Sequence, residues 1–109
     1  MGNCLRGDVI LVRYPFTDLS GSKIRPAVVV GLAHPSKDLI IVPLTSKTAF
    51  LLPGKFVMRE WRTAGLNVET AVKRGIYTVK DSLVMKLVGH VAPTDLNDLN
   101  SSLLRWLGF

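Results

Sequence analysis

Three short apolar runs rich in β-branched side chains constrain the fold of this chain more than any other feature. They cover residues 9–12, 27–30 and 39–42, and each is only four residues long. Runs of this length and composition are typical of β-strands and too short for helices. Weaker strand patterns cover residues 56–58, 66–72 and 83–91. The sequence therefore predicts about six short, mostly antiparallel strands.

The last segment has a different, helical period. Its apolar side chains recur at a spacing of three and four residues, and Pro93 suits a first helical position. They are Leu96, Leu99, Leu103, Trp106 and Leu107. We expect an amphipathic C-terminal helix whose apolar stripe packs on the sheet. With no linker or repeat in 109 residues, the chain is predicted to be one mainly-β domain spanning residues 1–109.

Two further patterns refine this expectation. Residues 59–64, followed by Gly65, indicate one or two helical turns closed by a glycine cap. Pro26 and Pro43 lie at strand entry or within a strand, which implies an edge, a bulge or a corner there. The fold class is therefore a strongly bent antiparallel sheet or a small barrel.

Composition excludes several classes of protein. One Cys rules out an internal disulfide framework, and no Cys/His cluster has metal-ligand spacing, so we expect no metal and no cofactor. No apolar run reaches 18 residues and the N-terminus lacks a secretory apolar region, so we expect no membrane partner and a cytoplasmic location.

The charge favours a polyanionic partner. The formal net charge is +6, of which +4 lies in residues 55–86 and +2 in residues 13–25. No basic tail or lysine block is present, so an anion site has to be assembled by folding from separate elements. A solvated face with scattered lysines is the alternative.

The most promising anion site combines Arg25 with Thr45. If residues 27–30 and 39–42 form a hairpin, Arg25 begins one strand and Thr45 ends the other, at the same end of the sheet. A guanidinium fork beside a hydroxyl donor is suited to phosphate. The alternatives are a turn with self-bonded hydroxyls at Thr45 and Ser46, and a surface ion pair between Arg25 and Asp18.

Four stretches resemble the MazF/PemK family of type II toxin–antitoxin ribonucleases. They read GDVILVRYPFTD at 7–18, SGSKIRPAVVV at 20–30, EWRTAGL at 60–66 and DSLVMKLVGH at 81–90. The first two are the most specific. The resemblance implies an SH3-like β-barrel with a C-terminal helix, a homodimer, and a cognate antitoxin as partner.

For function, the resemblance implies an endoribonuclease, an mRNA interferase that cleaves single-stranded RNA without a metal. It assigns the catalytic roles to Arg25 and Thr45, with Ser46 beside Thr45. In such a mechanism the ribose 2′-hydroxyl attacks phosphorus, and Arg25 stabilises the growing negative charge. The expected RNA-binding residues are Lys23, Lys47, Arg13, Lys73, Arg74 and Trp61. For Trp61, base stacking and core packing stand as equal alternatives.

One position departs from the family pattern. Arg74 falls where many relatives carry an Asp, so no carboxylate base is evident. Three alternatives stay open: another group accepts the proton of the 2′-hydroxyl, Arg74 contributes positive charge in place of the acid, or the ribonuclease activity is weak. Two further functions therefore stay open: a non-enzymatic toxin that binds a macromolecular target, like the gyrase-inhibiting relatives of this fold, and a catalytically weakened RNA-binding barrel.

Overall fold

The computed structural model describes residues 4–14, 23–33, 38–49 and 55–109. Within them the chain forms strands, one short 3-10 helix and one α-helix. The strands are β1 (Asp8–Tyr14), β2 (Lys23–Ala33), β3 (Asp38–Thr45), β4 (Phe56–Val57), β5 (Ala71–Val72), β6 (Tyr77–Val79) and β7 (Val84–His90). The 3-10 helix is η1 (Asp81–Leu83), and the α-helix is α1 (Pro93–Leu107). This is the mainly-β class with a C-terminal helix that the sequence predicts.

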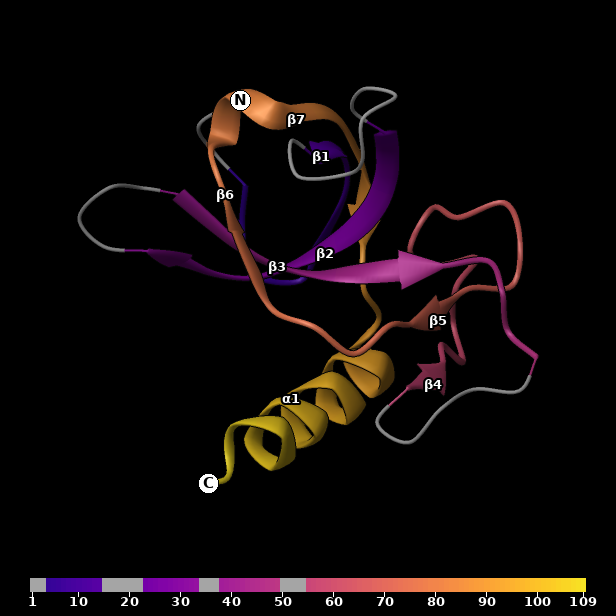
Figure 1. Cartoon of the computed structure of the whole chain (residues 1–109). Coiled ribbons are helices and arrows are strands. Elements are labelled where there is room, and N and C mark those ends of the chain that lie inside the picture. The colour runs from indigo at the N-terminus through magenta and orange to yellow at the C-terminus, as the bar shows by residue number, and fades with distance from the viewer. Residues whose placement is uncertain (1–3, 15–22, 34–37, 50–54) are drawn as a thin grey trace.

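All strand pairs are antiparallel, and the strands follow the order β4-β5-β3-β2-β1-β7. β6 also pairs with β3, at residues 39–41 of β3, which come before the residues of β3 that pair with β5. β2 and β3 form the expected hairpin at the centre, with Ala27 opposite Pro43 as the last pair before the strands part (Figure 1). Pro43 thus lies at a corner, as its ring and missing N–H predict.

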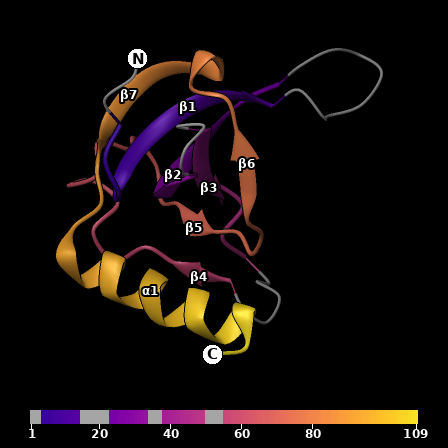
Figure 2. The same cartoon turned by 90° about the vertical axis from the view of Figure 1, so that its left-hand side faces the viewer.

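Alternation along the strands creates two apolar faces. One face gathers the side chains of Ile10, Val12, Ala27, Val29, Leu39, Ile41 and Val79 with Cys4. The other gathers Val9, Val28, Val42, Leu44 and Val72, and it is covered by α1 through Leu96, Leu99, Leu103 and Trp106. In both views α1 lies on the side of β4 and β5 (Figures 1 and 2). The predicted apolar stripe of the helix is therefore confirmed for these four side chains, whereas its fifth member, Leu107, is exposed.

The elements differ from the expectation in three places. β6 was not expected, because it is only three residues long and only its last residue, Val79, is buried. The strand expected over residues 66–72 is reduced to Ala71–Val72. Residues 59–65 form turns without an assigned helix, but the Ala64 N–H donates to the Glu60 carbonyl at 3.3 Å, as in one helical turn, and Gly65 has the left-handed φ of +89° that the predicted glycine cap requires.

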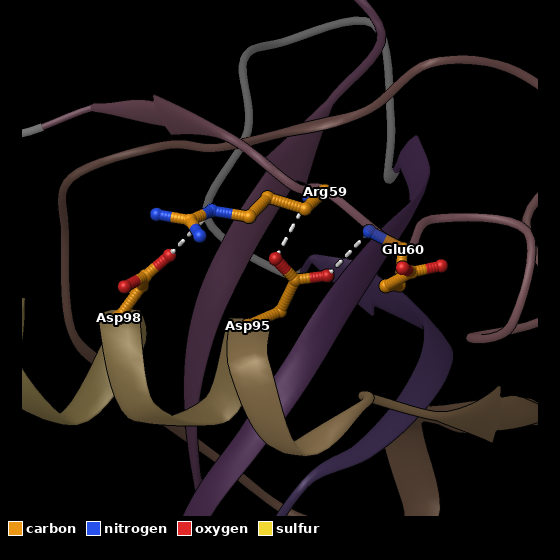
Figure 3. Close-up of polar contacts among 4 residues, drawn as sticks. All are labelled: Arg59, Glu60, Asp95 and Asp98. Carbon is orange, nitrogen blue, oxygen red and sulfur yellow. Dashed lines mark hydrogen bonds and ion pairs between the residues drawn. The ribbon is translucent and has the colours of Figure 1, made fainter.

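These turns are fixed to α1 by a buried carboxylate. The Asp95 side chain accepts the backbone N–H of Arg59 at 2.7 Å and that of Glu60 at 2.8 Å (Figure 3). Arg59 also contacts Asp98 at 3.4 Å. Asp95 lies in the first turn of α1, where a negative charge also suits the helix dipole.

The same turns approach the backbone of β7 closely. A Cβ at Gly89 would lie 2.2 Å from the carbonyl oxygen of Ala64, and a Cβ at Gly65 would lie 2.6 Å from that of Val88. Both positions therefore require glycine. Among the described residues, no helix is long and apolar enough to cross a membrane.

Candidate active site at the open end of the β2–β3 hairpin

Arg25 and Thr45 lie at the same end of the β2–β3 hairpin. Each is two residues beyond the last pair, Ala27 with Pro43, one on either strand. Side chains two residues apart share a face, so both project on the face of Ala27. On its other edge, Thr45 pairs with Ala71 of β5. The geometry that the sequence predicted for these two residues, at one end of one hairpin, is the one observed.

The Thr45 hydroxyl is held in place by the turn that follows β3. Its Oγ1 accepts the backbone N–H of Lys47 at 3.1 Å. This is the self-bonded turn that was weighed as an alternative to a phosphate site. The two readings are compatible, because a hydroxyl that accepts one hydrogen bond still has its own hydrogen to donate. The turn thus orients a donor at the strand end.

Arg25 is exposed and has a weak local contact. Its Nη1 donates to the carbonyl oxygen of Ile24 at 3.2 Å. Among the described residues it has no carboxylate partner. Asp18, the alternative partner considered for it, lies outside the described residues. A guanidinium that uses one donor toward the described residues is suited to receive phosphate oxygens with the others.

Further lysines lie close to this pair in the sequence or through the strand register. Lys23 lies two residues before Arg25 on β2, and Lys47 follows Thr45. The backbone N–H of Lys73 donates to the Pro43 carbonyl at 2.9 Å, which continues the β3–β5 register by one residue. That register puts Lys73 beside Pro43, on the face of Thr45. Ser46 comes directly after Thr45 and is exposed.

Three of the expected RNA-binding residues lie away from Arg25 and Thr45, namely Arg13, Arg74 and Trp61. Arg13 is adjacent to Val12, which pairs with Arg25, so it projects on the opposite face, and its Nη2 lies 3.9 Å from the sulfur of Met85. Arg74 lines a cavity of about 480 Å³ against α1 with Gly75, Ile76, Arg105 and Trp106. Arg74 is thus beside the helix rather than beside Thr45.

Trp61 belongs to the apolar layer between the sheet and α1, where it is half-buried. The Arg62 guanidinium lies over its ring, 4.7 Å from the centroid. One face of the indole is therefore already covered by a cation. These contacts favour core packing over base stacking for Trp61.

The described residues contain no group of three or more His, Cys, Asp or Glu side chains placed to hold a metal ion. The pair formed by Asp8 and His90, with 2.8 Å between Oδ1 and Nδ1, lies at the far end of β1 from Val12. The pairing depends on the β1–β7 register, which no local pattern indicates.

This fold, with its cationic hairpin end, defines a class of small toxin domains. The chain belongs to the family of PemK-like, MazF-like toxins of type II toxin–antitoxin systems, whose sequence profile matches residues 5–107. The match spans both the Gly7–Val30 block and the C-terminal helix. No curated protein sequence matches the chain.

Solved structures support the fold. An endoribonuclease from a mycobacterial species, in complex with its cognate antitoxin, is similar with a TM-score of 0.75 and 22% identity, covering 98% of this chain and 97% of that one. A second mycobacterial endoribonuclease gives 0.70 and 24%, covering 97% and 92%. The Mycobacterium tuberculosis toxin MazF-mt6 gives 0.70 and 14%, covering 94% and 97%.

Proposed function

We propose that the protein is the toxin of a type II toxin–antitoxin module and acts as an endoribonuclease on single-stranded RNA. The observation that carries this proposal is the placement of Arg25 and Thr45 on one face at one end of the β2–β3 hairpin. Membership of the toxin family and the similarity to two endoribonucleases support it. Lys23, Lys47 and Lys73 add the positive charge that a polyanion requires.

The reaction needs no metal in this proposal. The ribose 2′-oxygen attacks the adjacent phosphorus, the bond from phosphorus to the 5′-oxygen breaks, and the 2′-hydroxyl proton leaves. The products are a 2′,3′-cyclic phosphate and a 5′-hydroxyl end. Negative charge grows on the non-bridging oxygens, where the guanidinium of Arg25 stabilises it. The Thr45 hydroxyl, oriented by the Lys47 N–H, holds the phosphate in line for attack.

The direct test uses purified protein, a single-stranded RNA and a metal chelator. Cleavage to cyclic-phosphate ends is expected. Arg25→Ala is expected to reduce the rate by about 10²–10³-fold, because it removes a charge-stabilising donor. Arg105→Ala is a matched control that removes a guanidinium on the helix side of the sheet. A loss below about tenfold in Arg25→Ala contradicts the role assigned to this residue.

Non-enzymatic toxicity is the competing function. The exposed C-terminal side chains Leu107 and Phe109 are its structural basis, because the gyrase-inhibiting relatives of this fold use C-terminal residues. Inhibition of a DNA topoisomerase together with intact RNA would replace the proposal. Binding of RNA without cleavage would instead indicate the weakened RNA-binding barrel.

For partners, we propose single-stranded RNA, a cognate antitoxin and a second copy of the chain, all meeting in the cytoplasm. The chain exposes large apolar side chains on β7 and at the end of α1, namely Met85, Leu87, Leu104, Leu107 and Phe109. Exposed apolar area of this kind is typical of interaction surfaces. Sedimentation velocity at micromolar concentration is expected to give the mass of a dimer, and a monomer there contradicts the homodimer.

A further inference from the structure

The proposed reaction needs a proton acceptor, and the family resemblance puts Arg74 at the position where an Asp is expected. The chain has eight carboxylates. Six carboxylates of the described residues lie away from Thr45 in the sequence or belong to other elements. Asp8 binds His90, Asp38 begins β3, Glu60 lies in the turns beside α1, Asp81 is in η1, and Asp95 and Asp98 are in α1. Asp18 lies outside the described residues.

Glu69 is the remaining carboxylate, and the strand register brings it to the site. Thr45 pairs with Ala71 of β5, and Glu69 lies two residues before Ala71. Glu69 precedes the two paired residues of β5, so only its closeness in sequence to Ala71 follows from the register, whereas Lys73 continues the register on the face of Thr45. Glu69 is exposed, so RNA can reach it.

A hydrogen bond fixes this placement independently of the register. The Thr48 hydroxyl donates to Oε1 of Glu69 at 2.8 Å. Thr48 belongs to the same short segment whose Lys47 N–H orients the Thr45 hydroxyl. The turn after β3 therefore holds both the phosphate-positioning hydroxyl and the carboxylate. Oε2 of Glu69 has no hydrogen bond or ion pair with any described residue, so one acceptor oxygen is left.

We propose that Glu69 is the general base that accepts the 2′-hydroxyl proton, in place of the Asp of relatives. This proposal rests on the proposed ribonuclease function. As the bond from the 2′-oxygen to phosphorus forms, the proton moves to the Glu69 carboxylate, and the 5′-oxygen leaves with a proton from the cationic side of the site or from water. Thr48 is a positioning residue, because it contacts Glu69 and not the reacting atoms.

The experiment measures single-turnover cleavage of saturating RNA as a function of pH. A base acts only when deprotonated, so the wild-type rate is expected to rise with pH on the acidic side. Glu69→Gln keeps the size of the side chain and an oxygen for Thr48. It is expected to lower the rate by about 10²–10⁴-fold and to abolish that rise. Affinity for an RNA with a 2′-deoxy scissile nucleotide is expected to change by less than about threefold, since the amide still fits.

Two controls separate catalysis from structure. Glu60→Gln removes an exposed carboxylate outside the site and is expected to cleave like the wild type. Thr48→Val removes only the hydrogen bond to Glu69 and is expected to cause a smaller loss that keeps the rise with pH.

Four outcomes contradict the assignment. Glu69→Gln that cleaves within about threefold of the wild type excludes a base role, given the usual size of such effects. A lower cleavage rate in Glu69→Gln with an unchanged pH dependence shows that Glu69 has only a structural role. Loss of the pH rise in Asp18→Asn instead assigns the base to Asp18. Absence of cleavage by the wild type overturns the proposed function as well, so the two failures are distinguishable.

Discussion

The carboxylate of Asp95 accepts the backbone N–H of Glu60 at 2.8 Å, which joins the first turn of α1 to the turns that precede β5. The second oxygen accepts the N–H of Arg59 at 2.7 Å. Asp95 is 1% exposed, and both donors belong to the turns at residues 59–65. One buried side chain therefore satisfies two backbone N–H groups at the start of these turns (Figure 3).

Asp95→Asn is expected to destabilise the protein by about 1–3 kcal/mol, because the amide has a single acceptor oxygen for two backbone donors. Urea unfolding followed by far-UV circular dichroism measures the change. Asp98→Asn is the matched control, since its partner Arg59 is 70% exposed and surface ion pairs contribute little. Equal stabilities for the two variants would contradict the role given to Asp95.

The strands and the helix could be predicted because their signals are local. Runs such as 27–30 and the stripe from Leu96 to Leu107 each report one element by composition and period. The placement of Arg25 near Thr45 followed from one further assumption, that strands adjacent in sequence form a hairpin. The structure confirms that assumption.

The contacts of Glu69 and Asp95 could not be predicted, because they join segments that are distant in the sequence. Glu69 meets Thr48 across 21 residues, and Asp95 meets Glu60 across 35. Alternation in the expected strand 66–72 would have put Glu69 on one face, but not beside Thr45. Arg74 illustrates the converse: its position in the sequence suggested the site, yet it lies against α1 with Arg105.

Gly89→Ala is expected to destabilise the protein by about 3 kcal/mol, since its Cβ would lie 2.2 Å from the backbone oxygen of Ala64. Neither the turns nor β7 can move aside without breaking other contacts. Gly31→Ala is the control, because there the nearest atom, in the Ile40 side chain, is 3.8 Å away. Thermal unfolding of the two variants measures the difference, and a Gly89→Ala protein as stable as Gly31→Ala contradicts the close packing.

Cys4 is expected to react slowly with alkylating reagents in the folded protein. It is 5% exposed, and burial, followed by the nearby charge of Asp8, raises the pKa of its thiol. The reactive thiolate is therefore disfavoured in the native state. Because the unfolded thiol ionises at the lower pH, the contribution of Cys4 to stability is complete below the ordinary thiol pKa and is lost as pH rises from there through the raised pKa of the folded state. Iodoacetamide labelling with and without urea measures the rates, and similar rates contradict the burial of Cys4.

Lys73 and Arg74 are neighbours in sequence but are expected to differ in RNA binding. Lys73 lies on the face of Thr45, whereas Arg74 faces the cavity beside Trp106. Lys73→Ala is expected to weaken binding of a non-cleavable RNA and to lower the slope of log affinity against log salt by about 0.7, the value for one phosphate contact on a single strand. Arg74→Ala, the matched neighbour, is expected to leave the slope unchanged. Fluorescence anisotropy across a salt series measures both variants. The reverse order would show that RNA runs along the helix side of the sheet and would move the binding surface away from Arg25.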